Sequence, residues 1–193
     1  MEITVLASGS KGNCILISGG DGGLLVDCGL PARDVLARLG AAGKNPDPIR
    51  GIVLTHEHVD HVRGVWALAR RLKVPIFGTA GTLMELPREA SRGHCPTLHA
   101  VRPGETFGLG GFFLEAFPTS HDAREPCGFT LRCDDLRFTS CTDTGLIPDP
   151  AAARALRDAL GKTSGKTRLG IVNSIGARRD AEAVAALAEL TTD

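Results

Sequence analysis

Three of the six histidines in this 193-residue chain lie in one seven-residue segment, THEHVDH at 55–61. His56 and His58 are two residues apart, so in an extended segment both rings point to the same side. Asp60 and His61 follow in the same segment. Imidazole and carboxylate ligands in this spacing suit Zn²⁺, with Mn²⁺ or Fe²⁺ as substitutes. The segment therefore predicts a metal site, and a polar surface loop that is rich in histidine is the simpler alternative.

Two later segments offer further ligands. PTSHDAREPCGF at 118–129 places His121 after an apolar, β-prone run, and SCTDTG at 140–145 places Asp143 after another. We expect His121 to complete a three-histidine site with the first two histidines of the cluster. Considered alone, His121 would be an ordinary loop histidine and Asp143 a turn residue, so both assignments depend on the cluster.

A second ion is expected beside the first. Asp60 and His61 would hold it, and Asp143 would bridge the two ions. Two ions about 3.5–4 Å apart would activate a shared water and clamp the attacked oxygen. Asp122, next to the third histidine, is either a hydrogen-bonding partner of a ligand or a solvated residue.

The elements that must position these ligands are predicted to be alternating strands and helices. Apolar, β-prone runs lie at 2–7, 14–18, 24–27, 51–54, 75–77, 97–101, 112–117, 129–132, 136–140 and 169–173, and helical patterns at 31–39, 62–72, 82–89, 149–160 and 180–190. The cluster thus begins where a buried strand ends, a usual place for a site in an α/β fold. The pattern predicts a single α/β layered domain over 1–193, with an atypical tail at 161–193.

Composition excludes several functions. Lys+Arg and Asp+Glu both number 22, so the formal net charge is zero and no global field attracts nucleic acid or a membrane. The six cysteines form no CxxC pair, which favours core residues over a disulfide framework or a zinc finger. We find no signal peptide and no membrane span, and therefore expect a cytoplasmic protein without a membrane partner. The sequence does not specify an oligomeric state.

Taken together, these motifs resemble the metallo-β-lactamase fold superfamily. THEHVDH matches its H-x-H-x-D-H signature, and VDCG at 26–29 matches its Asp-containing strand. LASGSKGNC at 6–14 is similar to the opening motif of the YycJ (WalJ) group of small bacterial proteins within that superfamily. FPTSHDAREPCGF at 117–129 is similar to the third-histidine segment of that group, and TDTG at 142–145 to its bridging-aspartate segment.

The resemblance covers about residues 1–160 and implies an αββα sandwich, a two-metal hydrolytic site and a phosphodiester substrate. The YycJ group is described as 5′–3′ DNA exonucleases linked to repair. Carried over residue by residue, the resemblance implies one ion on His56, His58 and His121, and another on Asp60, His61 and Asp143. Asp60 would also orient the nucleophilic hydroxide, which makes it the expected catalytic residue.

The resemblance also suggests where a substrate would bind. Ser8, Ser10 and Asn13 lie on a Gly-rich loop whose backbone N–H groups could contact a phosphate. We therefore expect these three residues to bind substrate at the rim of the site. A tight strand connection that needs glycine is the alternative explanation for this loop.

The chain departs from the family pattern towards its end. No histidine follows His121, and IGARRDAE at 175–182 stands where the family carries a Gly-His-Leu-Ser element. We therefore expect a C-terminally truncated fold whose second site lacks one nitrogen ligand. The first site keeps three histidines and an open position, which is enough for a catalytic zinc.

The leading functional prediction is a metal-dependent hydrolase, acting as a phosphodiesterase or a 5′–3′ DNA exonuclease. Zero net charge gives DNA binding no support, so a small cyclic phosphate, a lactone or a thioester remains open as substrate. The alternative is a truncated, non-catalytic fold that binds metal or a partner, which the missing late histidine favours. Zinc storage or sensing is a third hypothesis.

Overall fold

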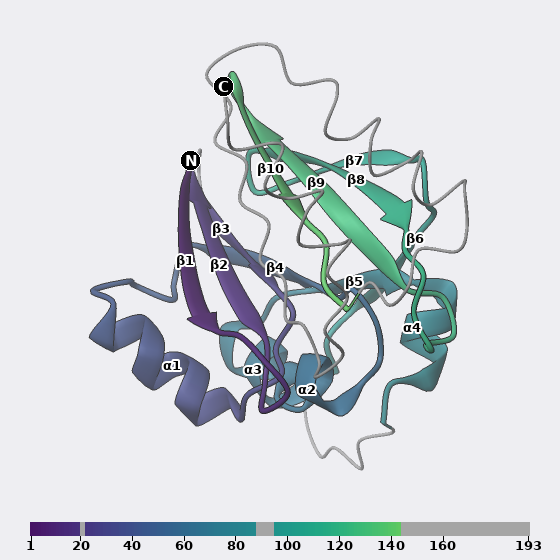
Figure 1. Ribbon diagram of the computed structural model, residues 1–193. Helices are drawn as coiled ribbons and strands as arrows, with labels where there is room; N and C mark the ends of the chain where they lie inside the picture. The colour runs from purple at the N-terminus through teal and green to yellow at the C-terminus, as the bar shows by residue number, and fades with distance from the viewer. Residues whose placement is uncertain (20–21, 88–94, 144–193) are drawn as a thin grey trace, which may run out of the picture.

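Two β-sheets pack face to face, and helices cover the outer side of the larger sheet (Figure 1). The computed structural model describes residues 1–19, 22–87 and 95–143. The predicted elements at 149–160, 169–173 and 180–190 and the tail at 161–193 lie outside the described residues. No helix in the described part is long and apolar enough to cross a membrane.

The larger sheet carries the strand from which the histidine cluster leaves. Its six strands lie in sequence order: β1 (Glu2–Ala7), β2 (Cys14–Gly19), β3 (Gly22–Val26), β4 (Ile49–Val53), β5 (Ile76–Thr79) and β6 (Leu98–Val101). The first three strands are antiparallel, whereas β3 to β6 are parallel. Parallel strands end at the same edge of a sheet, so the residues that follow β3, β4 and β5 lie near one another.

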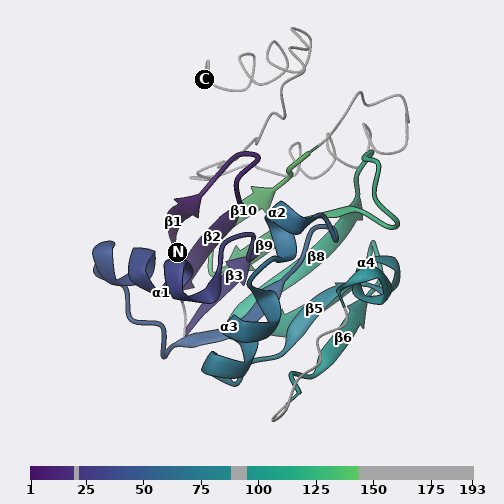
Figure 2. The ribbon, with the colours of Figure 1, turned by 90° about the horizontal axis from the view of Figure 1, so that it is seen from below.

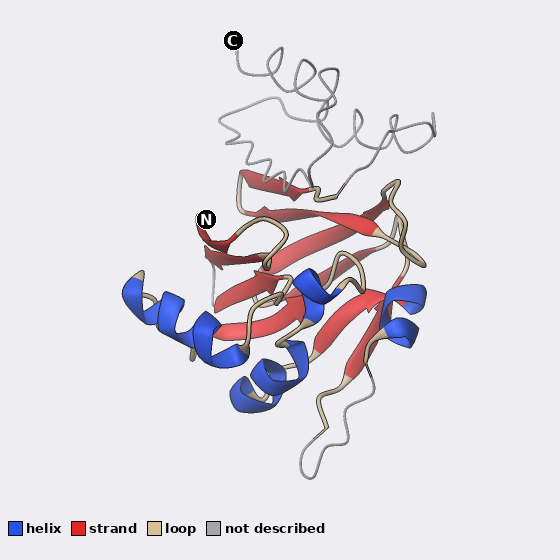
Figure 3. Ribbon diagram, turned by 60° about the horizontal axis from the view of Figure 1, so that its bottom comes forward, coloured by secondary structure: helices blue, strands red, loops and turns tan. Residues whose placement is uncertain are grey.

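The helices connect or follow the parallel strands. They are α1 (Ala32–Ala41), α2 (Val59–Val62), α3 (Val65–Leu72) and α4 (Ala80–Glu85). Figures 2 and 3 show all four helices on the outer side of the larger sheet, away from the smaller sheet. Val35 and Leu39 of α1 and Leu68 of α3 are fully buried in a cluster that includes Leu16 and Leu25 of the sheet. Burial of these apolar side chains stabilises the helix layer on the sheet.

The smaller sheet is antiparallel and covers the opposite face. Its strands β7 (Thr106–Leu109), β8 (Phe112–Pro118), β9 (Cys127–Cys133) and β10 (Leu136–Ser140) lie in the order β10-β9-β8-β7. Alternation along each strand sends one set of side chains into the space between the sheets. Ile17 of β2 packs there with Phe129 and Phe138, while its neighbour Leu16 faces the helices. The larger sheet is therefore buried on both faces.

Most predicted elements are confirmed within the described residues, including the strand that leads into the histidine cluster. Strand β7 is absent from the prediction. Its sequence, TFGL, is short, contains glycine and lies between RPGE at 102–105 and GG at 110–111. Such a segment carries a turn signal rather than a strand signal, so only its pairing with β8 reveals it.

Candidate metal centre

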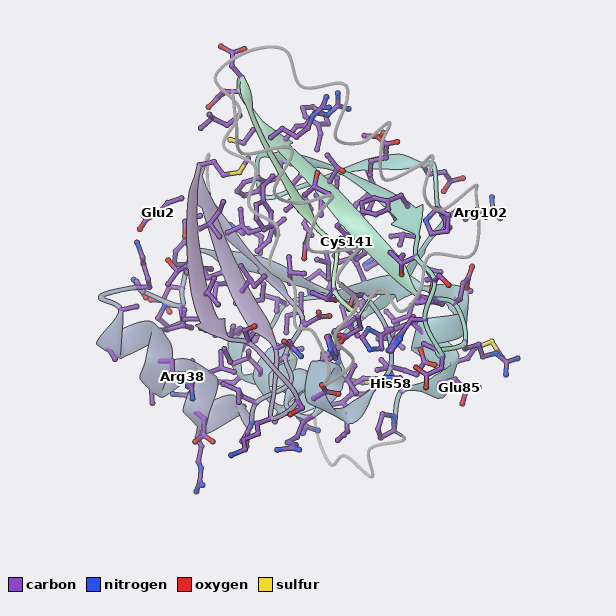
Figure 4. All side chains as sticks on the ribbon, viewed as in Figure 1. Glu2, Arg38, His58, Glu85, Arg102 and Cys141 are labelled. Atoms are coloured by element: carbon purple, nitrogen blue, oxygen red, sulfur yellow. The ribbon has the colours of Figure 1, made fainter. Side chains whose placement is uncertain are left out.

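Three strand ends from distant parts of the sequence meet at one place. His56 and His58 follow β4, His121 follows β8, and Asp143 follows β10. Figure 4 shows His58 at the lower ends of the two sheets, with Cys141 above it at the end of β10. Both sheets therefore contribute side chains to a single site.

The first group of converging side chains consists of His56, His58 and His121. One ligand nitrogen from each lies within 4.8 Å of the other two. His121 Nε2 lies 3.1 Å from His58 Nδ1, although 63 residues separate them in sequence. The ring centroids of His56 and His121 are 4.6 Å apart. The structure thus brings together the three rings that the sequence analysis assigns to the first ion.

A second group lies directly beside the first. His56, His61 and Asp143 offer ligand atoms within 4.8 Å of one another. His61 Nε2 lies 2.7 Å from Asp143 Oδ2 and 3.7 Å from Asp60 Oδ2. Asp143 Oδ2 is also 4.0 Å from His56 Nε2. The second group therefore contains His56, a member of the first group, where the sequence analysis expects Asp60, and the bridging role of Asp143 stays a prediction.

The four histidine rings share one arrangement. In each ring, one nitrogen contacts an oxygen outside the cluster, while the other nitrogen faces the remaining ligands. The outer contacts are His56 Nδ1 to Thr55 Oγ1 at 3.0 Å, His58 Nε2 to the Asp122 carbonyl oxygen at 3.3 Å, His61 Nδ1 to Asp27 Oδ2 at 2.8 Å, and His121 Nδ1 to Asp122 Oδ1 at 3.0 Å. An N–H donated outward leaves the inner lone pair available to a cation.

His56 supplies the test of whether these residues fit a metal. Its side chain is buried, and its Nε2 has no hydrogen-bond partner among the described residues. A buried polar atom without a partner costs free energy. A lone pair that faces two other imidazole rings is the kind of ligand that Zn²⁺ binds. The residues present therefore fit a divalent cation.

The electrostatics of the rings agree with this conclusion. Burial lowers the pKa of His56 to about 2, and the positive charges of His61 and His121 act in the same direction. Burial also lowers the pKa of His121. For His61 burial acts the same way, but Asp27 and Asp143 outweigh it and raise its pKa to about 10. The carboxylates of Asp27 and Asp143 thus favour a positive charge at His61, and a cation bound at Nε2 would supply that charge in place of a proton.

Asp27 is a supporting residue to which the sequence analysis assigns no role. It follows β3, is 1% exposed, and has a positive φ of 60° that is uncommon for a residue other than glycine. Its carboxylate accepts hydrogen bonds from the Thr55 backbone N–H and hydroxyl and contacts His61 Nδ1. Since the Thr55 hydroxyl donates to Asp27, it can accept from His56 Nδ1. The sequence signal that could have identified Asp27 is the segment VDCG, in which an apolar strand is followed by Asp.

The predicted substrate-binding residues separate in the structure. Ser8 and Ser10 are exposed, whereas Asn13 is 4% exposed. Asn13 Nδ2 lies 2.9 Å from His61 Nε2 and 3.4 Å from Asp60 Oδ2. Asn13 therefore lies among the second group of ligands, and the two serines lie at the surface of the same loop.

His99 and Asp122 can now be placed. His99 is exposed, stacks on Phe77 with ring centroids 4.8 Å apart, and belongs to neither group of ligands. His94 lies outside the described residues. Asp122 contacts two of the histidine rings through its carbonyl and carboxylate oxygens. Of the two alternatives in the sequence analysis, a hydrogen-bonding partner of the rings therefore describes it better than a solvated residue.

Comparisons with known proteins agree with this geometry. The family model for the metallo-beta-lactamase superfamily matches residues 7–169. The exodeoxyribonuclease WalJ of Streptococcus pneumoniae serotype 2 is 33% identical over 153 residues, which cover 78% of this chain and 57% of WalJ. The exodeoxyribonuclease YycJ of Bacillus anthracis is 34% identical over 153 residues, which cover 77% of this chain and 56% of YycJ. The chain thus spans little more than half the length of these relatives.

A more distant relative and two solved structures extend the comparison. A ribonuclease Z of Bradyrhizobium diazoefficiens is 31% identical over 149 residues, which cover 70% of this chain and 46% of that protein. A metallo-β-lactamase of Cronobacter sakazakii has a TM-score of 0.66 at 16% identity, covering 98% of this chain and 84% of that one. A B3 metallo-β-lactamase with an active-site glutamic acid has a TM-score of 0.64 at 21% identity, covering 94% and 81%.

The structural likeness at this low identity concerns the fold alone. It confirms the predicted α/β metallo-β-lactamase fold, of which the described residues form one helix layer and both sheets. The family model covers most of the chain and includes all the predicted metal ligands. The chain therefore belongs to the metallo-β-lactamase superfamily.

Proposed function

We propose that this chain is a metal-dependent hydrolase of phosphodiesters, and that DNA is its substrate, degraded as by a 5′–3′ exonuclease. The observation that carries the proposal is the shared arrangement of the histidine rings. Four rings are held from outside by oxygen atoms and present their second nitrogens to one another and to Asp143. Side chains fixed in this way are preorganised for a cation and need little rearrangement on binding.

We assign one cation to the first group, His56, His58 and His121, and the other to Asp60, His61 and Asp143, as the family resemblance implies. His61 and Asp143 belong to the second group, and Asp60 Oδ2 lies 3.7 Å from His61 Nε2 beside it. Zn²⁺ suits this mixture of imidazole and carboxylate, with Mn²⁺ or Fe²⁺ as substitutes. A divalent cation bound here would lower the pKa of water to about 7 and neutralise charge on the attacked phosphodiester.

Asp60 is the proposed catalytic residue. Its side chain is 23% exposed, whereas that of the adjacent His61 is 0% exposed. The carboxylate can therefore meet an incoming water, orient it and take its proton. The amide of Asn13, 3.4 Å from Asp60 Oδ2, helps to hold this carboxylate in place.

The names of the relatives support nucleic acid as the substrate. Two proteins that are 33% and 34% identical are exodeoxyribonucleases, and a third relative is a ribonuclease Z. The formal net charge of this chain is zero, so recognition of DNA would depend on local contacts at the site. The exposed Ser8 and Ser10 beside Asn13 are suited to contact a phosphate at the rim. We place this activity in the cytoplasm and assign it to one domain.

The test is a phosphodiesterase assay on protein that has been stripped of metal and reloaded. Zinc- or manganese-loaded protein should hydrolyse bis-p-nitrophenyl phosphate and shorten a single-stranded DNA from its 5′ end, and the stripped protein should do neither. Asp60→Asn should lower turnover at least about a hundredfold, whereas Asp34→Asn on the exposed face of α1 should not. Stoichiometric cation binding without turnover would contradict the hydrolase and favour the non-catalytic alternative. Cleavage of an RNA of the same sequence but not of the DNA would contradict the substrate assignment.

A further inference from the structure

The loop that carries His121 is hydrogen-bonded at its C-terminal end, through Glu125, to the start of α4. The carbonyl oxygen of Glu125 accepts hydrogen bonds from the hydroxyls of Thr79, at 2.6 Å, and Thr82, at 3.3 Å. The Glu125 carboxylate accepts another from the backbone N–H of Gly81 at 2.6 Å. Both threonines and the glycine are buried. Glu125 is therefore held through its backbone and through its side chain.

Close packing accompanies these hydrogen bonds. A Cβ atom on Gly81 would lie 2.5 Å from the Cβ of Glu125 and 3.0 Å from the Cγ of Arg124. The first distance is shorter than those that real Cβ atoms show, and the second is tight, so glycine at position 81 lets the loop approach α4 this closely. The loop thus rests directly on the first turn of the helix.

A second anchor ties the same loop to the histidine cluster. Glu57, which lies between His56 and His58 in sequence, accepts a hydrogen bond from the backbone N–H of Arg124 at 2.6 Å. Adjacent residues of the loop are therefore fixed on two different elements. A third contact, Arg124 Nη1 to Glu85 Oε1 at 3.0 Å, joins side chains that are 55% and 46% exposed. An ion pair so exposed contributes little.

These anchors matter because residues 121–125 form no helix or strand of their own. The Thr119 N–H donates to the Pro126 carbonyl oxygen at 3.2 Å and closes the base of the loop, but no ladder runs through residues 121–125, so their conformation also depends on the contacts of Arg124 and Glu125. Within it, the carbonyl oxygen of Asp122 reaches His58 Nε2, and His121 lies four residues before Glu125. A metal ligand must reach its place within about 0.2 Å. A small displacement of the loop would therefore weaken the first group of ligands.

We propose that Glu125 is a positioning residue for His121. Its carboxylate, bound to the Gly81 N–H, fixes the end of the loop and thereby sets how tightly His56, His58 and His121 together hold a cation. This inference rests on the proposed cation site. It adds a residue, outside the ligand set, that controls the affinity of that site.

The experiment measures the affinity of the chain for its most tightly bound zinc ion, by competition with a chromogenic chelator. Glu125→Ala should weaken it at least about tenfold, comparable to the loss of an outer hydrogen-bonding partner of a metal ligand. Glu125→Gln should recover most of the affinity, since its amide oxygen can still accept from Gly81. Glu85→Ala removes the exposed ion pair to the same loop, and its affinity should equal that of the wild type. In a His121→Ala background, Glu125→Ala should change the remaining affinity less than twofold.

The outcomes separate the two proposals. Absence of zinc binding by the wild-type chain would overturn the cation site itself. Zinc binding that Glu125→Ala leaves unchanged, or weakens equally with and without His121, would overturn the positioning role alone. If Glu125→Ala does not fold, Thr82→Val tests the proposal instead. This change removes one of the two hydroxyls that donate to the Glu125 carbonyl oxygen and keeps the shape of the side chain. Thr82→Val should weaken zinc binding about threefold in the wild type and not in His121→Ala. Equal affinities for Thr82→Val and the wild type would contradict the proposal.

Discussion

Asp27 links two of the histidine rings to the interior of the protein. It contacts His61 Nδ1 at 2.8 Å, and it reaches His56 through the hydroxyl of Thr55. The side chains of Asp27 and His61 are 2% and 0% exposed. A buried charge that has lost its partner is strongly destabilising, so a change at Asp27 should affect the fold as well as the site.

Asp27→Asn should lower the free energy of unfolding of the metal-free protein by about 3 kcal/mol. The amide cannot accept from Thr55 and also balance the charge of His61. Urea denaturation in the presence of a chelator measures the change. Asp34→Asn is the matched control, because the Asp34 side chain pairs with Arg33 at the surface and its loss should cost less than about 0.5 kcal/mol. A cost for Asp27→Asn as small as that of the control would contradict the supporting role.

Some of the site at this scale could be predicted from the sequence and some could not. The placement of His56 and His58 on one side follows from their spacing, which is a local property. The pairing of Asp27 with Thr55 spans 28 residues and depends on β3 lying parallel beside β4. The burial of Asn13 among ligands depends in the same way on long-range backbone contacts, such as Asn13 N–H to the Asp60 carbonyl oxygen at 2.7 Å.

At the scale of elements, backbone contacts between the turn after β3 and two neighbouring segments position His61 of the second group. The turn after β3 runs directly against α2 and against the loop that contains Asn13. The Gly29 N–H donates to the Asn13 carbonyl oxygen at 2.8 Å, and the Cys28 N–H donates to the His61 carbonyl oxygen at 2.7 Å. A Cβ on Gly29 would lie 1.6 Å from the Asp60 carbonyl oxygen. The ligands of α2 thus keep their place because this turn has no side chain at position 29.

Two glycine-to-alanine changes should therefore have opposite effects. Gly29→Ala should destabilise the chain by at least about 2 kcal/mol and weaken zinc binding, because backbone atoms must move. Gly40→Ala, in α1 with no heavy atom within 4 Å of the added Cβ, should stabilise by up to about 1 kcal/mol. Thermal melting of both variants measures this. Equal melting temperatures for Gly29→Ala and the wild type would contradict the role of these backbone contacts.

Element prediction succeeded where an apolar run stood between turn signals and failed where the segment itself contained glycine and few apolar residues. Strands such as β2 and β4 are apolar runs bounded by turn signals, so their positions follow from the sequence. Strand β7 owes its existence to pairing with β8, and the short helix α2 begins within the histidine cluster and ends one residue after it. The order of strands in the smaller sheet is likewise a tertiary property.

At the scale of the whole molecule, the site is built across two sheets. His56, His58 and His61 follow the larger sheet, whereas His121 and Asp143 follow strands of the smaller one. A cation shared by these residues would bind the folded chain and not the unfolded one. Binding should therefore stabilise the fold as a whole.

Zinc at a hundred times its dissociation constant should add about 2.7 kcal/mol to the free energy of unfolding. For a chain of this size that corresponds to a rise of roughly 5–10 °C in melting temperature. His58→Ala should abolish most of this rise, and His99→Ala, which changes an exposed ring stacked on Phe77, should retain it. A rise of the same size in His58→Ala and in the wild type would contradict the assignment.

The most direct test of the account is an anomalous-scattering map of a crystal of the chain soaked in zinc. The account predicts a zinc peak in contact with His56 Nε2, His58 Nδ1 and His121 Nε2, the inner nitrogens of the first group. A second, weaker peak is expected beside His61 Nε2 and Asp143. A crystal in which zinc binds elsewhere, while the three inner nitrogens of the first group touch no ion, would contradict the central claim.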